Sequence, residues 1–293
     1  MMSIPRTGGD DPLPYDMGNA GDLLKHGVLA EYVRWQCGLG VPLRFLDPFG
    51  GEPWGPVAPE VARRVRALTA CALRTAQTGI ESGRYYGSGF VVRHTAEAAG
   101  AKVRILSGDA SSARRQRLRA SGLGMLDEVF SARAGDAEHD PAPGYDGYRM
   151  LDAIVDGAEP GDFVLVDPFF DHFVRRRAAD VVPAVAKVTA RAAVLLFVLN
   201  PNPDDADGRR FDAFLRQQLP GAWRVACPPI RDTGVRGEAK YYAEIVLAGC
   251  CRMAAKTGGD AGALWQRLSD FTRQLAAILR LPADGLRPRI VGY

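Results

Sequence analysis

The sequence predicts an α/β protein with a mostly parallel sheet covered by helices on both faces. Short apolar runs that suit buried strands alternate along the chain with longer segments of helical periodicity. The last two apolar runs follow each other closely, which indicates an antiparallel pair. Of the 293 residues, 47% are hydrophobic and 24% are charged, which is typical of a globular protein with a sizeable core.

The first half of the chain begins with a helix and a short strand. Leu24, Val28 and Tyr32 recur at helical spacing, and "PLRFLD" then has the pattern of a buried strand. A loop rich in glycine and proline follows, "PFGGEPWGP". The elements expected in this half are helices at 20–36, 57–77, 89–99 and 110–121, and strands at 42–47, 102–107 and 128–134.

The second half contains the clearest strand, "AAVLLFVLN". Its continuous apolar character predicts burial on both faces of the sheet. The runs "WRVACPPI" and "YYAEIVLAGC" are expected to form the antiparallel pair. The elements expected in this half are helices at 146–157, 172–189, 204–219 and 260–280, and strands at 162–167, 192–200, 223–230 and 241–250.

The composition argues against several classes of protein. The net charge is only +3, so the overall electrostatic field does not by itself indicate a polyanionic partner. The five cysteines form no C-x-x-C motif and the four histidines are scattered, so neither disulfides nor a metal site is expected. The longest apolar run is far too short to span a bilayer, and the first residues do not resemble a signal peptide. We therefore expect a cytoplasmic protein without a membrane partner.

Acidic residues follow several of the expected strands. In an open α/β sheet, ligands bind beyond the carboxyl ends of the strands, an edge that we call the rim. Asp47 and Asp167 end the first and fourth strands, and Asp109 and Asp136 lie just beyond the second and third. A row of acids on the rim favours a ligand that carries hydroxyl, amino or amide donors. A merely polar rim is the alternative.

The loop "LDPFGG" indicates what kind of ligand the rim would bind. Gly50 and Gly51 would let the backbone approach a ligand closely. No G-x-G-x-x-G and no P-loop motif occurs, which disfavours a dinucleotide or a nucleoside triphosphate. A nucleoside without a phosphate tail fits better, and S-adenosylmethionine is the usual one. A glycine pair that only forms a turn is the alternative.

The stretch "VDPFF" suggests a site for an exocyclic amine. Asp167 should emerge at the rim, and Pro168 has no N–H, which leaves its carbonyl oxygen as the available backbone group. These two acceptors could hold the two N–H bonds of a nucleobase amine, while Phe169 or Phe170 stacks on the base. The alternative, which the sequence supports equally well, is that the two phenylalanines only pack into the core after the strand.

The start of the first helix, "GNAGDLLKH", carries unusual polar residues. Asn19 would cap the helix N-terminus. Lys25 and His26 lie among apolar neighbours, where a lysine normally extends its ammonium group to the surface. Beside the rim, Lys25 would instead pair with the carboxylate of a cofactor.

Together these stretches resemble the bacterial adenine-N6 methyltransferases of 23S ribosomal RNA, a branch of the class I S-adenosylmethionine-dependent methyltransferases. "NAGDLLKH" (19–26) is similar to the signature of the first helix in that family, and "YYGSG" (85–89) to a motif that closes its inserted subdomain. "DPFF" (167–170) stands where the family has Asp-Pro-Pro-Tyr, so Phe169 and Phe170 replace a proline and a tyrosine. The matches run in the same order from about residue 15 to residue 250.

The resemblance implies a Rossmann-like, seven-stranded, mostly parallel sheet with an inserted small helical subdomain. It implies a methyltransferase domain that begins within residues 1–51, an insertion at 52–86, the rest of the domain at 87–252 and a helical extension at 253–293. The acid that binds the ribose in the family is displaced here, and Asp109 is the nearest candidate. The residues expected to bind S-adenosylmethionine are Lys25, His26, Asp47, Gly50, Ser88, Asp109, Gly135 and Asp136, and the catalytic residues are Asp167, Pro168 and Phe170.

The leading hypothesis is a methyltransferase that acts on a nucleobase amine in RNA, most simply adenine N6. The arginine-rich segments 63–74 and 113–119 would contact phosphates; solvated helix faces are the alternative for such runs. Two other functions stay open at this point. The substrate could be a small molecule or a protein, or the chain could be a cofactor-binding module that catalyses nothing.

Overall fold

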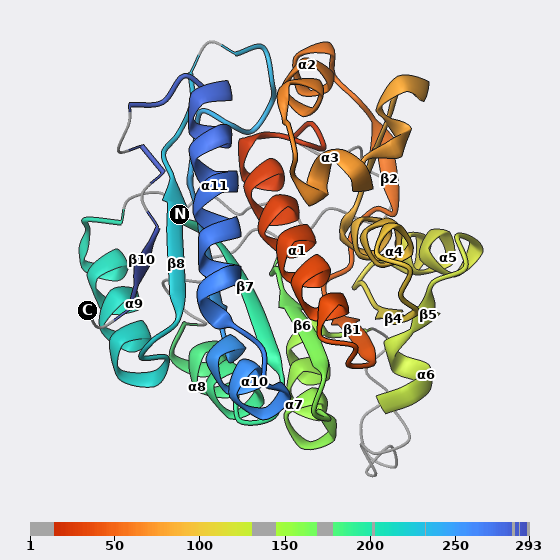
Figure 1. Ribbon diagram of the computed structural model, residues 1–293, viewed down its shortest axis with the longest axis vertical. Helices are drawn as coiled ribbons and strands as arrows, with labels where there is room; N and C mark the ends of the chain where they lie inside the picture. The colour runs from red at the N-terminus through yellow and green to blue at the C-terminus, as the bar shows by residue number, and fades with distance from the viewer. Residues whose placement is uncertain are drawn as a thin grey trace.

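The computed structural model describes residues 15–130, 145–168, 178–200, 203–231, 233–282, 285–286 and 288–291. In this part of the chain, an eight-stranded sheet has helices on both faces (Figure 1). The α/β class and the mostly parallel sheet are therefore confirmed. The prediction of seven strands is wrong by one, because a two-residue strand, β10 (Arg289–Ile290), adds to the edge of the sheet.

The strand order is β10-β8-β9-β7-β6-β1-β4-β5. The five strands from β7 to β5 pair in parallel, whereas β9 pairs antiparallel with both β7 and β8. The predicted antiparallel pair near the C-terminus is thus confirmed. The seven other strands are β1 (Leu43–Asp47), β4 (Val103–Ser107), β5 (Gly124–Met125), β6 (Asp162–Val166), β7 (Ala193–Asn200), β8 (Trp223–Cys227) and β9 (Tyr242–Ala248).

Strand β7 shows why the central runs are apolar throughout. Leu195 belongs to the core under one face of the sheet, and its neighbour Leu196 belongs to the core under the other face. Side chains alternate between the two faces of a strand, so a strand that is buried on both sides needs an apolar residue at every position.

Two layers of helices cover these faces. The first face carries α1 (Ala20–Gly38), α4 (Ser88–Ala98) and α11 (Ala261–Ile278), with α10 (Cys250–Thr257) beside α11. The second face carries α7 (Gly147–Gly157), α8 (Ala178–Val188) and α9 (Ala206–Gln218), with α6 (Leu126–Phe130) against α7. Helix α5 (Ser112–Ala120) precedes β5 at the edge.

The prediction of a strand at 128–134 is wrong for residues 128–130, which are the part of this segment that the structure describes. Residues 128–130 belong to helix α6, and the third parallel strand is β5, which lies earlier in the chain. Leu126, Val129 and Phe130 have the i, i+3, i+4 spacing of a helix, and Leu126 and Phe130 are buried in the second core. With only two residues, β5 is too short to show a strand period.

An insertion lies between β1 and α4. It opens with β2 (Trp54–Pro56) and closes with β3 (Arg84–Tyr86), and these strands pair antiparallel. Between them lie α2 (Pro59–Ala67), α3 (Ala72–Ala76) and the 3-10 helix η1 (Thr78–Ser82). One helix was expected over 57–77, but the chain leaves the helix at Leu68 and has a positive φ at Ala70. The carboxylate of Glu31 on α1 accepts a hydrogen bond from the Ala72 amide, which fixes the start of α3.

Candidate active site

The order of the strands reverses between β1 and β6. From β1 the chain continues outward through β4 and β5, and it then returns to build β6 and β7 on the other side. A crevice at such a topological switch point is where open α/β sheets bind ligands. Asp47 is the last residue of β1, and Asp167 follows directly on β6. The two predicted acids therefore flank the crevice.

Lys25 joins Asp167 to the first helix. Its ammonium nitrogen lies 2.6 Å from Oδ2 of Asp167 and 3.0 Å from Oδ1 of Asp22, and it lies 5.0 Å from the centroid of the Phe197 ring. Burial alone would lower the pKa of Lys25, but the two carboxylates raise it well above its usual value. Lys25 is therefore a buried cation that two acids share. As predicted, Asn19 caps this helix, because its side chain accepts from the Asp22 amide.

A small hollow opens beside Asp167. Its volume is about 90 Å³, several times what one water molecule requires. Asp167 and Pro168 line it together with Tyr15, Phe197 and the loop that precedes β9. The Asp167 side chain is 17% exposed, so its ion pair with Lys25 does not close it off from the hollow. Burial raises the pKa of Asp167, and Lys25 opposes that rise.

His26 and Ser88, both expected to bind the cofactor, lie within hydrogen-bonding distance of each other. The ring of His26 is within hydrogen-bonding distance of the Tyr85 hydroxyl at Nδ1, 3.0 Å, and of Ser88 Oγ at Nε2, 3.1 Å. Burial and the neighbouring Lys25 lower the pKa of His26 to about 3, so its imidazole is neutral at pH 7. The histidine thus ties helix α1 to the last strand of the insertion and to α4.

The loops after β1 and β4 contact each other on the side of β1 that is opposite to β6. The amide of Gly50 donates to the Gly108 carbonyl at 2.7 Å, and the amide of Gly51 donates to the Asp109 carboxylate at 3.1 Å. A Cβ at Gly50 would meet the Gly108 oxygen at 3.2 Å, so the absence of a side chain permits this close approach. Tyr145 lies against Gly108 and donates to the carbonyl of Pro48.

Asp47 and Ser107 lie side by side at the ends of these two strands. Burial and the nearby Asp167 raise the pKa of Asp47 to about 8, so it carries a proton at pH 7. The buried hydroxyl of Ser107 has no hydrogen-bond partner among the described residues. A protonated carboxyl and an unsatisfied hydroxyl suit a ligand that offers hydroxyl groups, such as a ribose. The residues present therefore fit a nucleoside cofactor.

Three of the expected site residues lie outside the described residues. They are Gly135, Asp136 and Phe170, and Phe169 lies outside as well. Within the described part, no group of three or more histidine, cysteine, aspartate or glutamate side chains could hold a metal ion. In the same residues, no helix has the length and apolar character needed to cross a membrane.

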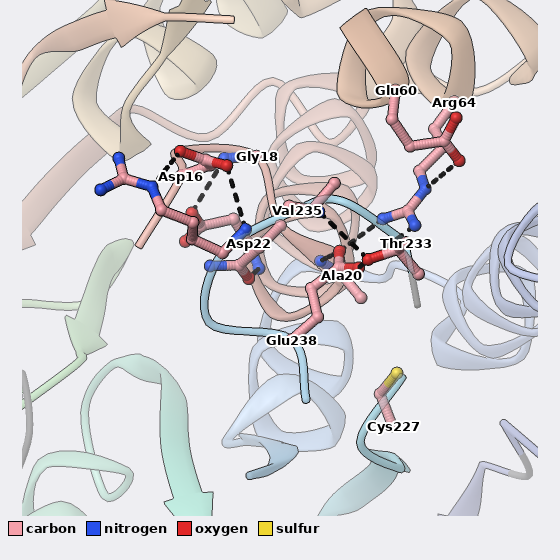
Figure 2. A network of polar contacts seen from close by, with 12 residues as sticks. Asp16, Gly18, Ala20, Asp22, Glu60, Arg64, Cys227, Thr233, Val235 and Glu238 are labelled. Carbon is pink, nitrogen blue, oxygen red and sulfur yellow. Dashed lines mark hydrogen bonds and ion pairs between the residues drawn. The ribbon is translucent and has the colours of Figure 1, made fainter. Parts of the chain in front are cut away.

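Sequence reasoning missed a second buried ion pair beside the hollow. Arg64 of α2, 2% exposed, donates to Glu238, which belongs to the loop before β9 (Figure 2). Glu238 also accepts from the Ala20 amide at 2.6 Å and from the Thr233 hydroxyl at 2.7 Å. Because the partners are 174 positions apart, no local pattern could have revealed them. This network fixes one wall of the hollow to the insertion and to the start of α1.

Most arginines of the two arginine-rich segments have acidic partners. Arg63 pairs with Glu60, Arg66 with Glu81, and Arg117 with Glu52. An arginine that is already paired offers less charge to a phosphate, so these segments support phosphate contacts only weakly.

No family model matches this chain, and no curated protein matches it either. Among solved structures, the chain is similar to protein LPL1258 from Legionella pneumophila str. Philadelphia 1, which is described with the family model DUF519. The identity is 12%, the TM-score is 0.58, and the match covers 93% of this chain and 97% of that one. This likeness shows a shared fold and nothing of function. WbdD matches with 14% identity and a TM-score of 0.39 over 80% of this chain and 41% of its own, too weak to carry an argument.

Proposed function

We propose that the protein is an S-adenosylmethionine-dependent methyltransferase that transfers a methyl group to an amine of a nucleobase, most simply adenine N6 in RNA. The observation that carries the proposal is the position of Asp167. This acid directly follows the end of β6, at the topological switch point of the sheet, and it lines a hollow together with Pro168. The protonated Asp47 and the unsatisfied Ser107 lie at the ends of the neighbouring strands β1 and β4.

The cofactor and the target amine would bind on two different sides of Asp167. Asp47, Gly50, Ser107 and Asp109 would hold the cofactor on the side of β1 and β4. Bound S-adenosylmethionine supplies an electrophilic methyl group on a sulfonium. The target amine would enter the hollow on the side of β7 and β9, so that Asp167 lies between donor and acceptor.

Asp167 and Pro168 would orient the amine. The nitrogen lone pair of an exocyclic amine is delocalised into the base, which makes it a poor nucleophile. A carboxylate and a carbonyl oxygen that accept its two N–H bonds favour a pyramidal nitrogen with a localised lone pair. Lys25 holds the carboxylate of Asp167 in place, and such positioning accounts for a large part of many enzymatic rate enhancements.

The proposal is tested with S-adenosylhomocysteine and with labelled cofactor. We expect calorimetry to detect binding of S-adenosylhomocysteine to the wild type, and labelled methyl groups to pass from S-adenosylmethionine to unmodified bacterial RNA. Asp167→Asn keeps the size of the side chain but removes its charge, and it should lower kcat at least about 100-fold while cofactor affinity changes little.

Two outcomes would contradict the proposal. The first is an absence of binding at millimolar S-adenosylhomocysteine, and the second is a wild-type rate in the Asp167→Asn variant. Transfer to small molecules of a cell extract but not to RNA would reject the substrate class and leave the cofactor assignment in place.

A further inference from the structure

A row of aromatic and arginine side chains lies on the outer face of the β2–β3 hairpin and continues onto α4, with Trp54 and Arg84 exposed and the other members half-buried. We call it the outer strip, and it consists of Trp54, Arg84, Tyr86, Phe90, Arg93 and His94. Trp54, 44% exposed, is the single large apolar side chain exposed at the surface of the described part. Nothing in the candidate active site accounts for this exposure.

Ring and cation contacts join the members of the outer strip in two groups, one on the hairpin strand β2 with Arg84 and one from Tyr86 onto α4. The guanidinium of Arg84 lies over the Trp54 ring at 4.7 Å, and Trp54 is directly opposite Tyr86 in the hairpin. Tyr86 stacks on Phe90 with their centroids 5.3 Å apart and their planes at 19°. Arg93 lies over Phe90 at 4.9 Å. His94 packs edge-on against Tyr86 at 4.8 Å.

The geometry of the hairpin links this strip to the active site. Side chains of a strand alternate between its two faces. Tyr85 therefore points inward, where it is fully buried and contacts His26, while Arg84 and Tyr86 point outward. His26 is adjacent in sequence to Lys25, which binds Asp167. The strip thus lies on the reverse side of a hairpin that itself helps to build the site.

The charge of the strip favours a polyanion. It contains two arginines and no acid, and the structure gives Arg84 no carboxylate partner within the described ranges. This differs from Arg63 and Arg66 nearby, which are paired with glutamates. Packing of Tyr86 on Phe90 fastens the hairpin to α4 and would serve stability alone, but it explains neither the exposed Trp54 nor the unpaired Arg84.

We propose that the outer strip binds a single-stranded segment of RNA by stacking of its bases. Aromatic rings and planar guanidinium groups stack on any base, and arginine also contacts phosphates. A protein partner would favour apolar contacts without such an excess of positive charge. The inference rests on the proposed function and extends it to a second part of the RNA substrate.

The test measures affinity for a labelled 12-nucleotide single-stranded RNA and for the corresponding duplex. The wild type should prefer the single strand, and binding should quench tryptophan fluorescence. Trp54→Ala should weaken binding of the single strand about 5- to 150-fold, the equivalent of losing one stacked base. Trp54→Phe keeps a ring and should recover most of this loss, which a merely unfolded hairpin would not allow.

The arginine is tested through salt dependence. Arg84→Ala should make the slope of log K against log salt shallower by about 0.7, the value for one lost contact to single-stranded nucleic acid. Arg267→Ala is the matched control, because Arg267 is exposed on α11, lies outside the strip and, like Arg84, has no carboxylate partner among the described residues. It should leave both affinity and slope unchanged.

The result separates this inference from the proposed function. An unchanged affinity of Trp54→Ala for the single strand, or a preference of the wild type for the duplex, overturns the outer strip as an RNA site. Binding of S-adenosylhomocysteine, measured in the same variants, should stay within twofold of the wild type. Its absence in the wild type would instead reject the cofactor assignment.

Discussion

Asp47 is a buried acid at the end of strand β1, and its pKa is raised to about 8 by burial and by the charge of Asp167. In the unfolded chain the same carboxyl group ionises near pH 4. Between these two values the folded state binds one proton more than the unfolded state. The free energy of unfolding contributed by Asp47 therefore falls as pH rises from about 4 to about 8.

We predict that Asp47→Asn flattens this dependence. Between pH 5 and pH 7 the variant should lose a slope of up to roughly 1.4 kcal/mol per pH unit, because asparagine does not ionise. Urea denaturation at a series of pH values measures the effect. Asp152→Asn, at an exposed position of α7, is the control and should keep the slope of the wild type. An unchanged slope in Asp47→Asn would contradict the raised pKa.

At this scale the sequence predicted the acids of the site but not their partners. Asp47 and Asp167 were found because strand ends are a local signal, and the structure places both at the switch point. The contact of Lys25 with Asp167 joins residues 142 positions apart, and that of Arg64 with Glu238 spans 174. Such distant pairs arise from packing, which a single sequence does not display.

Helix α1 crosses α11 at a glycine. A Cβ built on Gly27 would lie 1.8 Å from a ring carbon of Phe271, so the two helices approach too closely for a side chain there. Gly38 lies in the same helix, and a Cβ on it would meet no atom within 4 Å beyond the backbone of its own helix. The two glycines therefore differ chiefly in their tertiary surroundings.

We predict opposite effects of alanine at these glycines. Gly27→Ala should lower the free energy of unfolding by about 1–3 kcal/mol, because overpacking exceeds the gain in helix propensity. Gly38→Ala should be neutral or stabilising by up to about 1 kcal/mol. Chemical denaturation of the two variants side by side gives the comparison. Similar effects at both positions would show that the helix crossing tolerates a methyl group.

The buried pair of Arg64 and Glu238 joins the insertion to the loop before β9. We predict that Arg64→Met destabilises the protein by about 3–5 kcal/mol, because it leaves Glu238 charged, buried and without its cation. Glu238→Gln in the same variant should restore part of this loss. Arg63→Met, which removes an exposed arginine paired with Glu60, should cost no more than about 1 kcal/mol. If the double variant loses as much free energy of unfolding as Arg64→Met and Glu238→Gln lose together as single variants, the two residues are not coupled.

The elements that the sequence misplaced share a physical cause. Strand β5 has two residues, and the break between α2 and α3 depends on Glu31 of another helix. Long periodic segments such as α9 and α11 were located within a few residues, since their own amphipathic pattern determines them. Short elements are stabilised by neighbours and carry little pattern of their own.

At the scale of the whole molecule, the hydrophobic core under the first face of the sheet joins segments that the sequence analysis assigned to separate parts of the chain. The core under the first face includes Val65 of the insertion, Leu24 of α1, Phe271 of α11 and Phe45 of β1. Segments that share a core in this way unfold together in most small proteins.

We therefore predict a single unfolding transition. Single-tryptophan variants that keep Trp54 in the insertion, Trp223 in β8 or Trp265 in α11 should give the same urea midpoint as far-ultraviolet circular dichroism. Each variant is compared with the wild type by circular dichroism to control for the substitutions themselves. An earlier transition at Trp54 alone would identify the insertion as an independent unit.

The β2–β3 hairpin has one more consequence, which concerns insertions and deletions. Tyr85 faces His26 while its neighbours Arg84 and Tyr86 face outward, so a shift of one residue would exchange the two faces of the strand. Tyr85 would then face solvent, and the side chain of a neighbour such as Arg84 would point toward His26 and Gly18 instead. The number of residues between η1 and Ser88 is therefore more restricted than their identity. A homologous chain can replace side chains here more easily than it can lengthen or shorten the connection by one.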